Sequence, residues 1–149
     1  MSDPIDLTAF ATHDHRQCDL LWAEVEAAEG DSDAALAAWQ RFADAMERHF
    51  QMEEQVLFPA FEQATGMHGA GPTVVMRAEH QQMRGVLATM AEAAAAEDID
   101  LLLDHGDTLL MLIQQHNAKE EGMLYPMSAR AVGASWPALH TEIMERFYA

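Results

Sequence analysis

His49-Phe50-Gln51-Met52-Glu53-Glu54-Gln55-Val56-Leu57-Phe58-Pro59 is a stretch that the chain repeats as His116-Asn117-Ala118-Lys119-Glu120-Glu121-Gly122-Met123-Leu124-Tyr125-Pro126. Both copies read H-x-x-x-E-E-x-x-L-[F/Y]-P. Residues four apart lie on one face of an α-helix, so each copy sets an imidazole beside a carboxylate. Two such pairs offer the nitrogen and oxygen donors that a pair of transition-metal ions needs.

The composition around the repeat predicts an all-α protein. The chain has 149 residues, half of them hydrophobic, which suits a single domain over residues 1–149 with one core. The helix formers Ala, Leu, Met, Glu and Gln dominate, whereas Val and Ile are scarce and do not alternate with polar residues. We therefore expect helices and no sheet.

Charge and cysteine content restrict the partners and the compartment. A formal net charge of −17 argues against nucleic acid and anionic membranes, which attract basic surfaces. The single Cys18 cannot form an internal disulfide or a cysteine-rich zinc or iron–sulfur site. The acidic N-terminus lacks the apolar region of a signal peptide, and no apolar run reaches the length of a membrane span. These features predict a cytoplasmic protein.

Glycine, proline and polar clusters divide the chain into four long helical patterns and a short amphipathic tail. Ser32 or Asp33 is expected to cap the second helix, and Asp98 the fourth. The apolar spacing predicts an antiparallel up-down-up-down four-helix bundle with a short C-terminal helix. The five predicted elements are Leu7 to about Glu29, Ser32 to Thr65, Pro72 to about Ala96, Asp98 to about Val132, and Pro137 to Phe147.

The seam of the bundle contains the histidines and glutamates of the repeat. In the fourth helix the seam is read as Leu109, Ile113, His116, Glu120, Met123 and Met127. A charged carboxylate inside a dry bundle is costly unless it is paired or coordinated. The repeat also extends upstream, because Asp14-His15-Arg16-Gln17 resembles Glu79-His80-Gln81-Gln82. Each helical hairpin thus supplies one lone His and one His-x-x-x-Glu.

If the two hairpins pack about a pseudo-twofold axis, four imidazoles and two carboxylates converge. Two bridging carboxylates suit two divalent ions about 3.5–4 Å apart, each ion taking two imidazoles. This donor set fits iron, manganese or zinc better than calcium or magnesium. The predicted metal ligands are His15, His49, Glu53, His80, His116 and Glu120.

On these six residues and the two E-E-x-x-L-[F/Y]-P extensions, the chain resembles the haemerythrin-like, HHE cation-binding domains over nearly its whole length. The resemblance implies a non-haem di-iron bundle, with two iron ions (Fe2+ or Fe3+) and an oxo or hydroxo bridge as one possible form. Oxygen-carrying members have H-x-x-x-H on the third helix, where this chain has Arg84, and H-x-x-x-x-D on the fourth, where this chain has Glu120 and Glu121. Reversible oxygen carriage is therefore not expected.

The pattern of four His and two Glu is closer to the iron–sulfur cluster repair di-iron proteins and to the iron- and oxygen-sensing domain of a ubiquitin-ligase F-box subunit. The repair proteins carry an extra cysteine-containing N-terminal domain, which is not among these 149 residues, so a full repair role is not expected. The main hypothesis is a protein that binds or senses O2, NO or peroxide, or that handles iron in a stress response. Its partners would be metal ions and small diatomic ligands, with a homo-oligomer left open.

Two other functions stay open at this stage. One is a di-iron enzyme, such as a peroxidase, an oxidase, a nitric oxide reductase or a relative of the cluster repair proteins, for which no catalytic residue is identified. The other is a bundle in which the metal, zinc or manganese included, only stabilises the fold.

The remaining residues of interest receive structural assignments. Glu54 and Glu121 lie one position further round the helix and are expected to be solvated or to support a ligand His. Cys18 is expected to be a small buried hydrophobe. Phe58 and Tyr125 are expected to be packing residues, with contact to a bound ligand as the alternative for Tyr125. Pro59 and Pro126 should bend their helices. The histidines predicted to be exposed at the surface are His13, His68 and His140.

Overall fold

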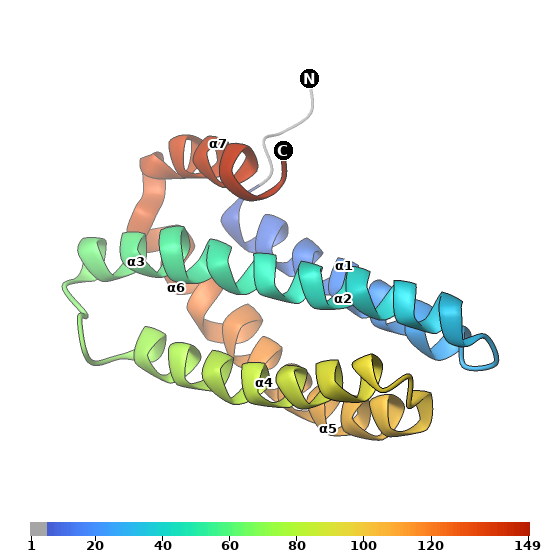
Figure 1. Ribbon diagram of the computed structural model, residues 1–149. Helices are drawn as coiled ribbons and strands as arrows, with labels where there is room; N and C mark the ends of the chain where they lie inside the picture. The colour runs from blue at the N-terminus through green and yellow to red at the C-terminus, as the bar shows by residue number, and fades with distance from the viewer. Residues whose placement is uncertain (1–5) are drawn as a thin grey trace.

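The computed structural model describes residues 6–149. Within that range the chain is all-helical, with no strand, and its four long helical segments are consistent with a bundle (Figure 1). The elements in chain order are α1 (Leu7–Ala27), α2 (Ser32–Met52), a π-helical turn (Glu53–Leu57), α3 (Phe58–Thr65), α4 (Pro72–Ala95), α5 (Ile99–Lys119), a second π-helical turn (Glu120–Leu124), α6 (Tyr125–Val132), a 3₁₀ turn (Gly133–Ser135) and α7 (Trp136–Phe147).

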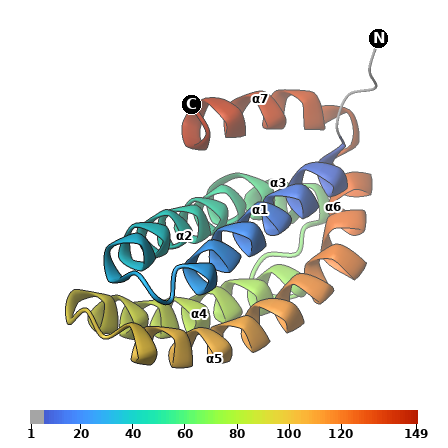
Figure 2. The ribbon, with the colours of Figure 1, turned by 90° about the vertical axis from the view of Figure 1, so that its right-hand side faces the viewer.

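Short polar loops join α1 to α2 and α4 to α5, so that each pair packs side by side as a hairpin (Figures 1 and 2). The Asp98 carboxylate accepts a hydrogen bond from the Leu101 N–H at 3.1 Å, which confirms the predicted cap of α5. The prediction for α2 was wrong by one residue. Its cap is Asp31, which accepts from the Ala34 N–H at 3.1 Å, and Ser32 begins the helix.

Both copies of the repeat contain a π-helical turn that starts at the first glutamate. The Phe58 N–H bonds to the Glu53 carbonyl and the Tyr125 N–H to the Glu120 carbonyl, five residues back in each case. A proline follows each turn, and it has no N–H to give to the carbonyl four residues earlier. The expected disturbance at the prolines therefore takes the form of a widened turn, and Figure 2 shows α5 curving into α6 beyond it.

The widened turn also corrects the predicted seam of the fourth segment. Met123 was expected to face the core, but it is 45% exposed, and Leu124 is buried at 1% in its place. A π-helical turn inserts one residue relative to regular α-helical spacing, so the buried face moves by one position after Glu120. Regular spacing of three and four residues cannot anticipate such a shift.

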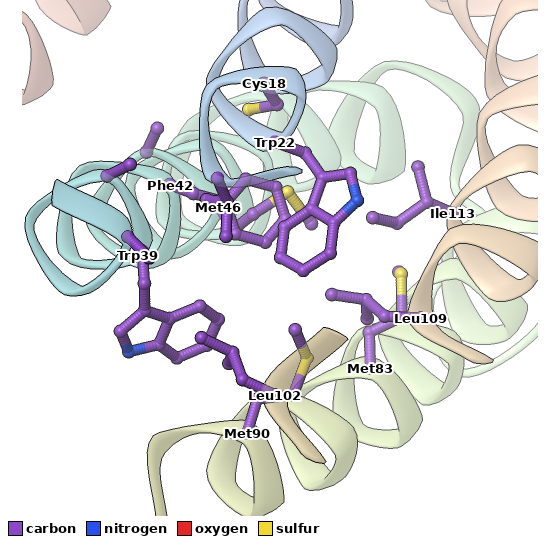
Figure 3. Close-up of a cluster of buried hydrophobic side chains, with 14 of the residues drawn as sticks. Cys18, Trp22, Trp39, Phe42, Met46, Met83, Met90, Leu102, Leu109 and Ile113 are labelled. Atoms are coloured by element: carbon purple, nitrogen blue, oxygen red, sulfur yellow. The ribbon is translucent and has the colours of Figure 1, made fainter. Parts of the chain in front are cut away.

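Two apolar clusters lie on either side of a polar layer. The larger cluster is formed by the ends of α1, α2, α4 and α5 that carry the two hairpin loops, and Figure 3 shows Trp22 at its centre. A Cβ added to Gly106 would lie 2.1 Å from the Trp22 ring, so this glycine makes room for the indole. The second cluster includes Leu7, Phe61 and Leu124 at the opposite ends of the helices.

The C-terminal helix α7 packs against the second cluster, through a fully buried Ile143. Trp136 lies 5.8 Å from the Phe10 ring, and the Tyr148 hydroxyl donates to Asp14 at 2.6 Å. The C-terminal helix therefore packs against the rest of the bundle. Among residues 6–149, none of the helices combines the length and the apolar character needed to cross a membrane.

Candidate metal centre

The polar layer between the two clusters brings together all six residues that the sequence nominated as ligands. His15 comes from α1, His49 and Glu53 from the second segment, His80 from α4, and His116 and Glu120 from the fourth segment. Both carboxylates and His80 are fully buried, and the other three imidazoles are 2–3% exposed. Burial of this much polarity needs compensation from partners or cations.

The six side chains form two groups that share both carboxylates. One group is His15, His49, Glu53 and Glu120, and the other is His80, His116, Glu53 and Glu120; within each group the donor atoms lie within 4.8 Å of one another. Glu53 Oε1 is 3.3 Å from His49 Nε2 and 3.1 Å from His80 Nε2. Glu120 Oε1 is 3.0 Å from His15 Nε2 and 3.1 Å from His116 Nε2. Each carboxylate thus contacts one imidazole of each group.

Several atoms in the layer that could bind a metal ion are buried and have no hydrogen-bond partner. They are Glu53 Oε1, Glu120 Oε2, His80 Nε2 and His116 Nε2. The nearest carboxylate oxygens to the two nitrogens lie at 3.1 Å, but not in hydrogen-bonding geometry. Unpaired lone pairs that face one another in a dry interior are unfavourable unless a cation lies among them. The residues present therefore fit a metal ion in each group.

The outer nitrogen of every imidazole in the centre is held by a second carboxylate. His15 Nδ1 donates to Glu121 at 2.7 Å and His80 Nδ1 to Glu54 at 2.7 Å. A carboxylate only accepts, so in the neutral ring the proton is on Nδ1 and the Nε2 lone pair faces the centre. This is the arrangement in which an outer carboxylate orients a metal-binding histidine and raises its basicity.

The other two outer carboxylates come from the residues just before the lone histidines. Asp14 accepts from His49 Nδ1 at 2.7 Å, and Glu79 accepts from His116 Nδ1 at 2.9 Å. These two bonds stay within a hairpin, whereas those of Glu54 and Glu121 cross between hairpins. The pattern obeys the pseudo-twofold relation of the repeat. Of the two expectations for Glu54 and Glu121, support of a histidine is the one the structure shows.

Sequence reasoning missed Asp14 and Glu79 as supporting groups. The available signal was the upstream repeat itself, in which an acidic residue precedes the lone histidine in both copies. Arg84 takes no place among the donor atoms. Its guanidinium bonds both oxygens of Glu54, at 2.8 and 3.0 Å, and also pairs with Glu47.

Opposing influences set the protonation of the centre when no cation is present. Burial alone lowers the pKa of His49, but the charge of Glu53 and the hydrogen bond to Asp14 outweigh it and hold that pKa well above its usual value. Burial likewise lowers the pKa of His80, but the charge of the neighbouring Glu53 and the hydrogen bond to Glu54 raise it further than burial lowers it. Protons on imidazoles thus balance the buried carboxylates, and a cation would replace them.

Tyr125 combines packing with a polar contact at the centre. Its ring packs as expected, but its hydroxyl reaches the donor atoms and lies 2.7 Å from Glu53 Oε2 and 3.0 Å from Glu120 Oε1. Phe58, the equivalent residue of the first copy, stacks on the His80 ring at 5.5 Å. Phe58 is therefore the packing residue that the sequence predicted.

The remaining assignments are mostly upheld. Cys18 is buried, and desolvation raises the pKa of its thiol to about 11, so it behaves as a small hydrophobe. His13 and His68 are exposed. The prediction for His140 was wrong, because its ring is partly buried by stacking on Trp136 at 5.2 Å and by an edge contact with Phe10.

Comparison with known proteins agrees with this geometry. The family model of the hemerythrin HHE cation binding domain matches residues 6–128, which include all six residues of the centre and their four outer carboxylates. No significant match exists among curated proteins or solved structures. A match over most of the chain, together with two His and Glu groups able to hold a cation, identifies this chain as a member of the hemerythrin HHE cation-binding domain family.

Proposed function

We propose that the protein is a non-haem di-iron protein. His15 and His49 hold one iron ion, His80 and His116 hold the other, and Glu53 and Glu120 serve both. The observation that carries this proposal is that the two four-residue groups have both carboxylates in common. In this proposal residues 1–149 form one domain, an antiparallel up-down-up-down bundle, and the metal centre lies in the polar layer between the two apolar clusters.

The chemistry of the donors supports iron, and does not by itself separate iron from zinc or manganese. Imidazole and carboxylate are ligands of all three metals. A bound iron pair supplies electron-transfer chemistry and coordination positions for a small ligand. The chain contributes an orienting carboxylate for each imidazole, which fixes the Nδ1–H tautomer and turns Nε2 toward the ion.

The space beside the centre supports a very small ligand. A cavity of about 10 Å³ touches His15, His49 and His116 on the side of the larger apolar cluster, and its other walls include Cys18, Met46 and Met83. That volume is about one water-sized sphere. We infer that the ligand is O2, NO or peroxide and that the protein binds or senses it, or handles iron, in the cytoplasm during stress.

The test is the absorption spectrum of iron-loaded protein, recorded without air and then after addition of air, NO or peroxide. The proposal expects new bands with at least one of the three, and their loss in His116→Ala. His13→Ala is the control, since His13 is exposed and lies on the same helix as His15. A spectrum that does not change with any of the three ligands would overturn their binding and sensing by this protein. Repeated consumption of peroxide or NO would make the protein an enzyme.

A further inference from the structure

We propose that the phenol oxygen of Tyr125 is a further ligand, bound to the ion that His15 and His49 hold, so that the two ions have unlike surroundings. This inference rests on the proposed di-iron function and deepens it. It concerns one atom, the Tyr125 Oη, and the four donor atoms that surround it.

The Tyr125 hydroxyl lies inside the donor set of one group and not at its edge. Its Oη is 2.7 Å from Glu53 Oε2, 3.0 Å from Glu120 Oε1, 3.0 Å from His15 Nε2 and 3.5 Å from His49 Nε2. These are all four residues of that group. The side chain is 1% exposed, so water does not reach the hydroxyl freely.

One phenol proton cannot satisfy these neighbours. A hydroxyl donates one hydrogen bond, and the two carboxylate oxygens only accept. The Nε2 atoms of His15 and His49 are also acceptors in the neutral rings, because their Nδ1 atoms donate to Glu121 and Asp14. When both rings are neutral, which is the state that binds a metal ion, several lone pairs converge on the phenol oxygen with a single proton among them. A cation bound by all of them removes this conflict.

The spacing of these atoms is that of neighbouring ligands on one ion. Metal–nitrogen and metal–oxygen bonds of about 2.1 Å that meet at a right angle put the ligand atoms about 3.0 Å apart. Three of the four distances from Tyr125 Oη lie between 2.7 and 3.0 Å. Phenolate oxygen is an established ligand of iron in proteins.

The backbone explains how Tyr125 reaches this position. The π-helical turn bonds the Tyr125 N–H to the Glu120 carbonyl, so Tyr125 lies one turn beyond Glu120 on the same side of the helix. The same turn exists in the first copy, where it brings Phe58 against the His80 ring. The His80 and His116 group thus has an apolar ring where the other group has an oxygen. The asymmetry at this position comes from one oxygen atom, because both copies place an aromatic ring there.

The experiment is resonance Raman and visible absorption spectroscopy of protein loaded with iron(II) and oxidised in air. The expected result is a phenolate-to-iron(III) band with enhanced tyrosine ring vibrations, which shift when the protein contains ring-deuterated tyrosine. Both signals should disappear in Tyr125→Phe, which makes the two copies alike at this position. Tyr148→Phe is the matched control, since the Tyr148 hydroxyl donates to Asp14, outside the donor set. It should keep both signals.

The outcomes separate this inference from the function on which it rests. Two oxidised irons per chain without phenolate vibrations would overturn the role of Tyr125 and leave the di-iron function standing. Failure to bind iron would overturn both. Labelled Tyr148→Phe protein decides the question even if Tyr125→Phe does not fold, because Tyr125 is then the one tyrosine left in the 149-residue sequence. Signals that persist in a folded Tyr125→Phe would assign them to another tyrosine and refute the inference.

Discussion

Glu54 offers a sharp test of the outer carboxylates, because it touches a histidine of the centre without belonging to the donor set. Its Oε2 is 2.7 Å from His80 Nδ1, and its side chain is 19% exposed. His80 is fully buried, so Glu54→Ala leaves its Nδ1–H without this acceptor. Loss of such a partner weakens metal binding about 10–100-fold, which is about 1.4–2.8 kcal/mol. Glu54→Gln should lose less, because its amide oxygen can still accept the hydrogen bond.

The assay is an anaerobic titration of metal-free protein with iron(II) against a competing chelator. Glu47→Ala is the matched control. Glu47 and Glu54 share Arg84 as an ion-pair partner, but Glu54 alone of the two bonds a histidine. Iron affinity should therefore fall in Glu54→Ala and stay near wild type in Glu47→Ala. Equal losses in the two variants, or none in either, would refute the role assigned to Glu54.

Two further predictions concern stability. Gly106→Ala should destabilise the fold by about 1–3 kcal/mol or more in chemical denaturation, because its Cβ meets the tryptophan ring at 2.1 Å. Gly85 lies in open space within α4, so Gly85→Ala should instead stabilise the fold by up to about 1 kcal/mol. The two substitutions should therefore change the free energy of unfolding in opposite directions. In metal-free protein the pKa values of His49, His80 and His116 are raised above 6.5. Protonation of these rings therefore contributes its full stabilisation of the fold below that pH, and this stabilisation is lost as the pH rises through the raised pKa values. The Tm of metal-free protein should therefore fall above about pH 6.5 while iron(II) affinity rises, since bound imidazoles are neutral; a Tm that rises with pH would contradict this assignment.

Most of the fold could be read from the sequence because the signals are local. Asp98 caps α5, and Gly66, in a left-handed conformation, caps α3 after Thr65, the predicted end of the second helix. The exposed Met123 shows where such reading stops. A proline indicates that a helical hydrogen bond is lost, but it does not say whether the chain bends or inserts a residue, and the π-helical turn changes which residues face inward.

The convergence of the six residues was predictable because the repeat implies its own symmetry. The hydrogen bonds around these six residues were harder to predict. Whether Glu54 supports the histidine of its own hairpin or that of the other depends on helix rotation, which spacing along one helix does not fix. Tyr125 was predicted chiefly to be a packing residue, with contact to a bound ligand as the alternative, because the position of its hydroxyl depends on the π-helical turn that directs it inward.

The central claim is that Glu53 and Glu120 are shared by two metal ions, and the most direct test is the iron content of the protein. Metal-free chain is loaded with iron(II) without air, freed of unbound metal and analysed for iron and protein. The account predicts two iron ions per chain, and loss of both in Glu53→Ala because each ion depends on that carboxylate. One iron or none in the wild-type chain, or two irons retained by Glu53→Ala, would contradict it.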